Sequence, residues 1–120
     1  MNKNPDRCRF AVAMDSIFGK WKPIIIHLLL QDQTLRFNEL RRLLPDITQR
    51  MLTLYLRELE AEEIVSRVVY PQVPPKVEYS ITQYGKSLAP IIEALHQWGA
   101  NHIERKKLDD GTIEHTESDS

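Results

Sequence analysis

A chain of 120 residues with 42% hydrophobic content can form one domain around one core. The formal charge of −1 hides an uneven distribution, because all 16 Lys and Arg but only 12 of the 17 Asp and Glu lie in residues 1–107. That span carries a net charge of +4, which permits binding to phosphates. We predict a single domain over residues 8–107 and an acidic, disordered tail over residues 108–120.

The same composition argues against membrane, secreted and catalytic classes of protein. No apolar run approaches the roughly 20 residues of a membrane span, since the longest, residues 24–30, is interrupted by His27. The N-terminal ten residues lack a hydrophobic signal core, and one cysteine cannot form an intramolecular disulfide, so we expect a cytoplasmic protein. The four histidines are dispersed, Cys8 has no CxxC partner, and no glycine-rich phosphate loop exists. We therefore expect no metal, no cofactor and no enzymatic activity.

Two helices are predicted at the start of the domain. Apolar positions in residues 8–18 indicate a short helix, and a glycine follows it. A proline suits the first turn of a second helix over about residues 23–31, whose nearly continuous apolar character is typical of a central core helix. Lys20 and Lys22, on either side of Trp21, are interpreted as solvated charges.

The next segment predicts a helix-turn-helix. Residues 34–36 are a candidate for a very short strand, and residues 37–44 predict a third helix that Pro45 ends. A three-residue turn, PDI, leads into the helix TQRMLTLYLRELEAE over residues 48–62, with Thr48 as its N-cap. We expect the third helix to turn its apolar side chains inward, namely Phe37, Leu40, Leu43 and Leu44.

The helix over residues 48–62 has two faces of different chemistry. Its apolar face comprises Leu52, Tyr55, Leu56 and Leu59. Arg can pair with guanine, Gln with adenine, and Thr with a base edge or a thymine methyl, so the outward face suits the DNA major groove. The outward Leu54 is interpreted as either meeting a thymine methyl or packing against the hairpin that follows. An ordinary amphipathic surface helix would show the same stripe, and only the surrounding elements favour DNA. The predicted base-reading residues are Gln49, Arg50, Thr53 and Arg57.

A β-hairpin is predicted directly after the helix-turn-helix. IVSRVVY is rich in β-branched residues and VEYSI alternates, which indicates strands at about 64–70 and 76–81 joined by the loop PQVPP. A hairpin in this place is typical of a wing. The fold class is therefore mainly α with a small β-hairpin, a winged helix-turn-helix. Contacts to the DNA backbone are predicted for Arg36, Asn38, Thr48 and Lys76.

The last predicted helix, residues 83–107 with Thr82 as cap, has more apolar surface than one small domain can cover. The simplest cover is a second copy of the chain, packed against this helix and the N-terminal helix. The homodimer interface is predicted to contain Val12, Ile17, Leu88, Ile91, Ile92, Leu95 and Trp98.

Three segments resemble those of HxlR-type winged-helix transcriptional regulators: FGKWKPIIIHLLL, RFNELRRLLPDITQRMLTLYLRELEAEEIVSR and YPQVPPKVEYSITQYGKSL. The resemblance implies a homodimeric bacterial DNA-binding protein, with the second helix of the helix-turn-helix in the major groove and the wings along the flanking backbone. We expect it to bind double-stranded DNA at a palindromic operator and to be nucleoid-associated when bound. The sequence departs from the family at two places. Arg9 stands where a proline often follows the N-terminal cysteine, and Glu62-Glu63 stands where the family commonly has glycine.

Cys8 carries a second hypothesis, because it lies between Arg7 and Arg9 near a helix start, where positive charge favours the thiolate. The resemblance adds that several such regulators sense oxidants or electrophiles through a cysteine in this region. The alternatives are a buried cysteine without a sensing role, a regulator gated by an unidentified small ligand at the dimer cleft, and a winged-helix module that binds another protein.

Overall fold

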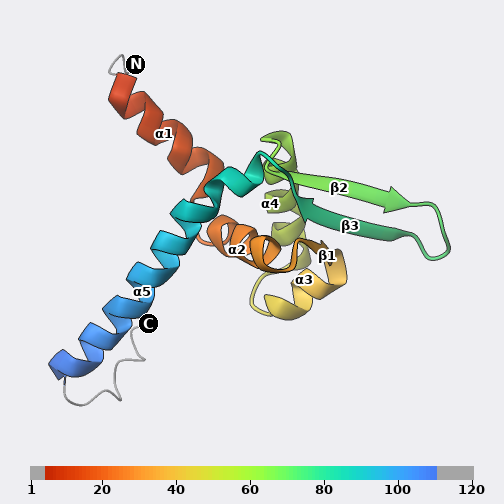
Figure 1. The fold of residues 1–120 in the computed structure, drawn as a ribbon. Coiled ribbons are helices and arrows are strands. Elements are labelled where there is room, and N and C mark those ends of the chain that lie inside the picture. The colour runs from red at the N-terminus through yellow and green to blue at the C-terminus, as the bar shows by residue number, and fades with distance from the viewer. Residues whose placement is uncertain (1–4, 111–120) are drawn as a thin grey trace. The chain divides into compact units, whose positions relative to one another are not determined.

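The computed structural model describes residues 5–110, and the side chains of residues 9–108 within them. Two compact units divide the chain at Ala89 and Pro90. The first holds all the elements before α5, and the second holds almost the whole of α5 (Figure 1). In chain order the elements are α1 (Pro5–Ile17), α2 (Lys22–Asp32), β1 (Thr34–Arg36), α3 (Phe37–Leu43), α4 (Gln49–Ala61), β2 (Val65–Tyr70), β3 (Lys76–Ile81), the 3-10 turn η1 (Gly85–Leu88) and α5 (Ala89–Asp110).

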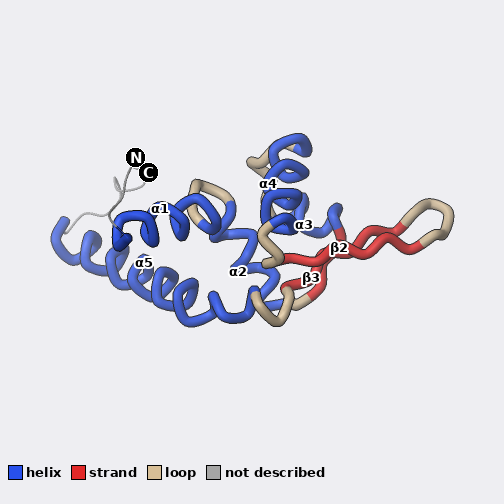
Figure 2. The backbone as a smooth tube through the Cα atoms, turned by 90° about the horizontal axis from the view of Figure 1, so that it is seen from above, coloured by secondary structure: helices blue, strands red, loops and turns tan. Residues whose placement is uncertain are grey.

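The predicted fold class, a mainly helical chain with a small β-hairpin, is confirmed. Each predicted helix and strand of the first unit exists, with ends within about three residues of the expected ones. The β1–β3–β2 order makes a three-stranded antiparallel sheet. Tyr79 of β3 lies between Leu35 of β1 and Arg67 of β2, and the Thr34 and Ser80 hydroxyls are 2.8 Å apart. The β2–β3 hairpin extends beyond the helices of its own unit (Figure 2).

The core is built on α2, α3 and α4. The helix α2 carries the apolar run that the sequence placed centrally, and α4 buries its leucine stripe as predicted. One inward prediction is wrong: Leu43, the last residue of the two-turn helix α3, is 49% exposed, whereas Leu40 and Leu44 are buried. The fully buried side chains are Ile25, Ile26, Leu29, Leu40, Leu52, Leu56, Leu59 and Val65.

Lys22 is not the solvated charge that the sequence suggested. Its side chain is 9% exposed, and its Nζ donates to Glu58 Oε1 at 2.8 Å and to the Asp15 carbonyl at 3.1 Å. Lys20, by contrast, is exposed, with its Nζ 5.2 Å from the centre of the Trp21 ring. The sequence pattern could not separate the two lysines, because only the tertiary contact with α4 buries one of them.

The last helix begins later than predicted. Instead of a continuous α-helix from residue 83, the chain makes the 3-10 turn η1 before α5 starts at Ala89. Pro90, in the first turn of α5, has no N–H with which to continue a helix from residue 83. Thr82 anchors the turn, since its Oγ1 accepts from Gly85 N at 2.7 Å and donates to the Glu63 and Ile64 carbonyls. The segment is thereby held against the end of α4 and the start of β2. Residues 108–110 of the predicted tail belong to α5, and residues 111–120 lie outside the described residues.

The end of α4 explains one departure from the family pattern. Glu63 has a φ of 66°, the left-handed conformation that glycine adopts without cost. Ile64 N donates to the Leu59 carbonyl at 3.0 Å, which closes the helix end around Glu63. The cap therefore exists, with a glutamate in the position that glycine usually occupies.

We expect Glu63→Gly to raise the free energy of unfolding by about 1 kcal/mol, because an L-residue in the left-handed region costs about that much. Thermal and urea unfolding measure the change. Glu63→Ala is the matched control, since it removes the carboxylate but keeps the backbone cost, and it should give no such gain. Equal stability of the glycine and alanine variants would contradict this account of the helix end.

Candidate nucleic-acid interface

The helix α4 is anchored on one face and capped at its start. Thr48 is extended, and its Oγ1 accepts from Met51 N at 3.1 Å, so the predicted cap is confirmed. Leu52, Leu56 and Leu59 have no exposed surface and hold the helix on the core. Because the apolar stripe is buried over three consecutive turns, the opposite face points away from the core.

That opposite face is the one predicted to read bases. A shallow hollow of about 390 Å³ lies along it. Arg50 and Arg57 are exposed, and neither makes an ion pair within the described residues. Leu54 is 48% exposed, so it points outward as the helical pattern indicated. The hollow is lined by Arg50, Met51, Thr53, Leu54 and Arg57.

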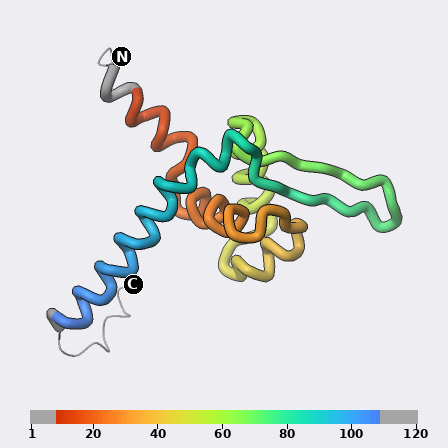
Figure 3. Tube along the Cα trace, in the orientation of Figure 1, coloured from red at the N-terminus to blue at the C-terminus, as the bar shows by residue number. Residues whose placement is uncertain are grey.

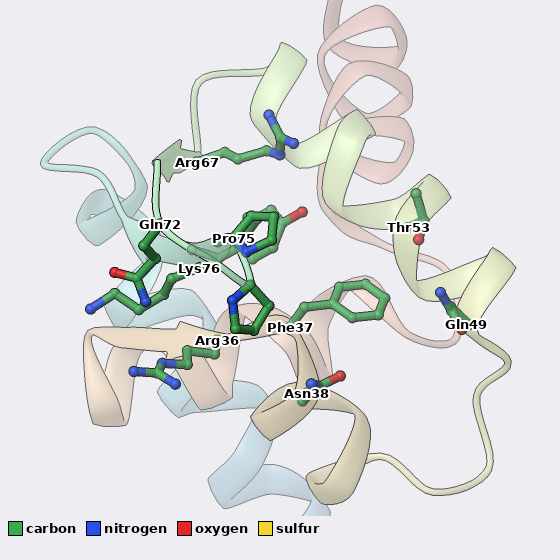
Figure 4. Close-up of a pocket in the computed structure, with 12 residues that line it drawn as sticks. Arg36, Phe37, Asn38, Gln49, Thr53, Arg67, Gln72, Pro75 and Lys76 are labelled. Atoms are coloured by element: carbon green, nitrogen blue, oxygen red, sulfur yellow. The ribbon is translucent and has the colours of Figure 1, made fainter. Parts of the chain in front are cut away.

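A groove of about 490 Å³ lies between the start of α3, the outer face of α4 and the β2–β3 hairpin (Figure 4). It brings together five residues predicted to contact DNA, Arg36, Asn38, Gln49, Thr53 and Lys76. Its lining contains three cationic side chains and no carboxylate, so the groove is electrostatically suited to bind an anion. The remaining lining residues are Phe37, Arg67, Gln72, Pro74, Pro75, Val77 and Tyr79.

The hollow and the groove adjoin at Thr53, which lines both of them, so the outer face of α4 lies next to the groove beneath the hairpin. We call the hollow and the groove together the α4–wing surface. Of the predicted DNA contacts, only Thr48 lines neither part, since its hydroxyl caps α4.

Lys76 is the most constrained cation of the groove. Its Nζ lies 3.7 Å from Glu78 Oε2 and 4.6 Å from the centre of the Tyr70 ring. Its side chain is only 25% exposed. A phosphate would therefore compete with Glu78 for this lysine.

Arg67 was not among the predicted site residues. In the register of the hairpin it lies opposite Tyr79 and shares a strand face with the buried Val65. That face covers the core near Val65 and continues over the groove at Arg67, which is exposed. The strand period of two places Arg67 on the same face as Val65, and this could be inferred from the sequence. Which face of β2 lies toward the groove became clear only from its pairing with β3.

Two further arginines extend the basic surface along α3. Arg41 and Arg42 are exposed and line a separate hollow of about 380 Å³ with Asn38 and Pro45. Asn38 also lines the groove, so this hollow adjoins the α4–wing surface.

The predicted dimer residues differ in exposure. On α1, Val12 is 63% exposed and Ile17 is buried. On α5, the spacing of Ile91, Leu95 and Trp98 forms a helical stripe, and these side chains are 46%, 43% and 65% exposed. Leu88 is partly exposed, Ile92 is buried, and the side chain of Cys8 lies outside the described residues.

The part of the chain that the structure describes contains no group of three or more His, Cys, Asp or Glu side chains that could hold a metal ion. No described helix is long and apolar enough to cross a membrane.

A family model, a sequence relative and two solved structures are similar to this chain, and all are helix-turn-helix proteins or transcriptional or redox regulators. Residues 16–107 match the family model for HxlR-like helix-turn-helix proteins. The HTH-type transcriptional regulator YybR of Bacillus subtilis (strain 168) is 52% identical over 99 residues, 82% of this chain and 78% of YybR.

Two solved structures of the redox regulator HypR are also similar to this chain. The oxidised form has a TM-score of 0.74 and 54% identity, covering 78% of this chain and 96% of that chain. The reduced form has a TM-score of 0.76 and 51% identity, covering 85% and 98%.

Proposed function

This chain belongs to the HxlR-like helix-turn-helix family, and from that premise we propose that it is a transcriptional regulator that binds double-stranded DNA sequence-specifically through α4. The observation that carries the proposal is that the hollow on α4 and the cationic groove beneath the hairpin adjoin at Thr53. Base-reading side chains and backbone-binding cations share one face, as simultaneous contact with bases and phosphates requires. The protein has no catalytic role in this proposal and acts in the cytoplasm.

In the proposed complex α4 lies in the major groove. Arg50 and Arg57 are two helical turns apart, a separation of about 10 Å along the helix axis. That distance spans about three base-pair steps of about 3.4 Å each. Each arginine can form a bidentate pair with guanine, while Gln49 at the helix start suits adenine and Thr53 a thymine methyl. The four side chains together read one half-site.

Phosphate contacts are assigned to the groove around α4. Arg36 and Asn38, at the start of α3, and Lys76 and Arg67, on the hairpin, flank the helix. Thr48 contributes through the exposed start of α4. These contacts fix the position of the protein on DNA and carry no sequence information.

We further propose that two copies of the chain bind a palindromic operator. The exposed apolar side chains Val12, Ile91, Leu95 and Trp98 support an interface between α1 and α5 of two copies. A two-fold dimer would place its two half-sites about 34–36 Å apart, or a small multiple of that distance.

Cys8 is proposed as the thiol through which an oxidant or electrophile changes DNA binding. The support is the similarity to HypR, which is described as a redox regulator in oxidised and reduced forms. Because Cys8 is the single cysteine, any disulfide joins it to a second chain or to a small thiol. Cys8→Ser should abolish any effect of a mild oxidant on DNA affinity.

Salt dependence tests the proposed partner class. Binding to a duplex should weaken steeply with salt, with a slope of log affinity against log salt of about −0.9 per phosphate contact. A complex with a protein partner would lack this relation. Fluorescence anisotropy of a labelled duplex between low and physiological salt makes the measurement.

Arg67→Ala tests the backbone contact that the sequence pattern did not reveal. We expect affinity to fall by a similar factor for every DNA sequence, and the salt slope to shrink by about 1, because one phosphate contact is lost. Lys86→Ala removes an exposed cation outside the groove lining and is the matched control. A sequence-dependent loss in the Arg67 variant, or an unchanged salt slope, would contradict a phosphate contact.

A further inference from the structure

Among the described residues, Lys22 is the one charged side chain that is buried. It is the first residue of α2, and its Nζ reaches both the Asp15 carbonyl near the end of α1 and the Glu58 carboxylate on α4. One ammonium group therefore joins three helices. The path of the chain from α1 through α2 to α4 can be followed in Figure 3.

The contact with α1 is electrostatically specific. Asp15 is two residues from the end of α1, where carbonyls lack partners within the helix and a cation is favoured. A second bond joins the same two helices, since Ser16 Oγ donates to Glu62 Oε1 at 3.4 Å. The end of α1 is thus bonded to the side and the end of α4.

The contact with α4 lies beside the base-reading face. Glu58 follows Arg57 directly and is one helical turn after the exposed Leu54. A bond that fixes Glu58 limits rotation of α4 about its axis, and this rotation determines where Arg57 points.

Stability alone does not account for a lysine here. The Glu58 side chain is 43% exposed, so water screens its attraction to Lys22, whereas the buried ammonium loses its own hydration. An apolar side chain of similar length would be about as stable in this position. Direction is what the lysine adds, because hydrogen bonds to two fixed acceptors have a required geometry and apolar packing does not.

We propose that Lys22 is a positioning residue for DNA reading, which holds α4 at a fixed rotation against α1. A displacement of α1 then moves the base-reading face of α4 through this residue. The inference rests on the proposed function and assigns the link between the N-terminal helix and the recognition helix.

The test compares Lys22→Met with the unchanged protein, using a duplex selected by that protein and a scrambled duplex of equal length. We expect the ratio of specific to non-specific affinity to fall about tenfold, the size of effect that follows when one arginine–guanine pair is misaligned. Non-specific affinity and the salt slope should stay constant, because no phosphate contact is removed.

Two variants complete the experiment. Lys20→Met changes the neighbouring exposed lysine and should leave the ratio unchanged. Glu58→Gln keeps an acceptor for Lys22 and removes the charge, so it should lower the ratio in the same direction by a smaller factor, and it keeps the test decisive if Lys22→Met does not fold.

The outcomes separate this inference from the function on which it rests. In one outcome the wild-type protein selects a motif, and Lys22→Met and Glu58→Gln keep its ratio of specific to non-specific affinity. That result overturns the role of Lys22 and leaves the proposed DNA-binding function intact. Equal loss of specific and non-specific affinity with a lower melting temperature would assign Lys22 a purely stabilising role, which also overturns it. If the unchanged protein selects no motif, the proposed function fails first and this inference fails with it.

Discussion

Replacing Arg50 and Arg57 together by alanine is expected to weaken operator binding by more than an order of magnitude. Each bidentate arginine–guanine pair contributes about 1–3 kcal/mol of discrimination, and the double variant loses both. The fold should be unaffected, because both side chains are exposed and make no ion pair within the described residues. Anisotropy with the selected duplex measures affinity, and thermal unfolding checks the fold.

The control for this pair removes the same charge elsewhere. Lys20→Ala with Lys86→Ala eliminates two exposed cations that line neither the hollow nor the groove. We expect this control to change affinity little and to preserve the selected sequence. Full operator affinity in the double arginine variant would contradict the assignment of α4 as the recognition helix.

The second large effect is expected from Gly85→Ala. A Cβ at this position would meet the Ile64 carbonyl oxygen, a backbone atom, and would lie 2.8 Å from Ile81 Cδ1. Thr82 fixes the segment by its bond to Gly85 N, so the backbone cannot move away without losing that bond. Overpacking of this kind typically costs about 1–3 kcal/mol, and a clash with backbone belongs at the upper end. Urea unfolding measures the loss.

Gly99→Ala is the matched control for Gly85→Ala. Gly99 lies inside α5, and apart from its chain neighbours and the backbone of its own helix no described atom lies within 4 Å of an added Cβ. The same substitution should therefore stabilise the chain by about 0.5–1 kcal/mol, because alanine is the better helix former. Opposite signs for the two variants are the expected result, and equal signs would contradict the close packing at Gly85.

The elements that could be predicted from sequence are those fixed by local pattern. The leucine stripe of α4 repeats at helical spacing, and its burial requires only that the helix meet a core. Thr48 caps a helix through its own side chain, so the start of α4 is a local property. The β-branched run and its proline-containing loop marked the hairpin for the same reason.

What escaped prediction depends on partners distant in the sequence. Lys22 resembles Lys20 in its local surroundings, and only Glu58, on another helix, distinguishes them. Arg67 became a groove residue only through the register of β2 against β3. The bonds that hold the turn η1 join Thr82 to the carbonyls of Glu63 and Ile64, just after α4, and a helical propensity cannot anticipate them.

The site residues divide in the same way. Gln49, Arg50, Thr53 and Arg57 share a face by helical periodicity, which is local. Arg36, Asn38 and Lys76 lie next to that face only in the folded protein, because they come from other elements, α3 and the hairpin. The resemblance to known regulators supplied that assembly as an expectation, and the groove in Figure 4 supports it.

Selection of random duplex DNA by the purified chain tests the central claim most directly. The chain should enrich a palindromic motif whose half-sites lose their preference when Arg50 and Arg57 are replaced. Repeating the selection after a mild thiol oxidant shows whether the motif depends on the state of Cys8. Failure to enrich any motif in either redox state would contradict the claim that the α4–wing surface reads DNA.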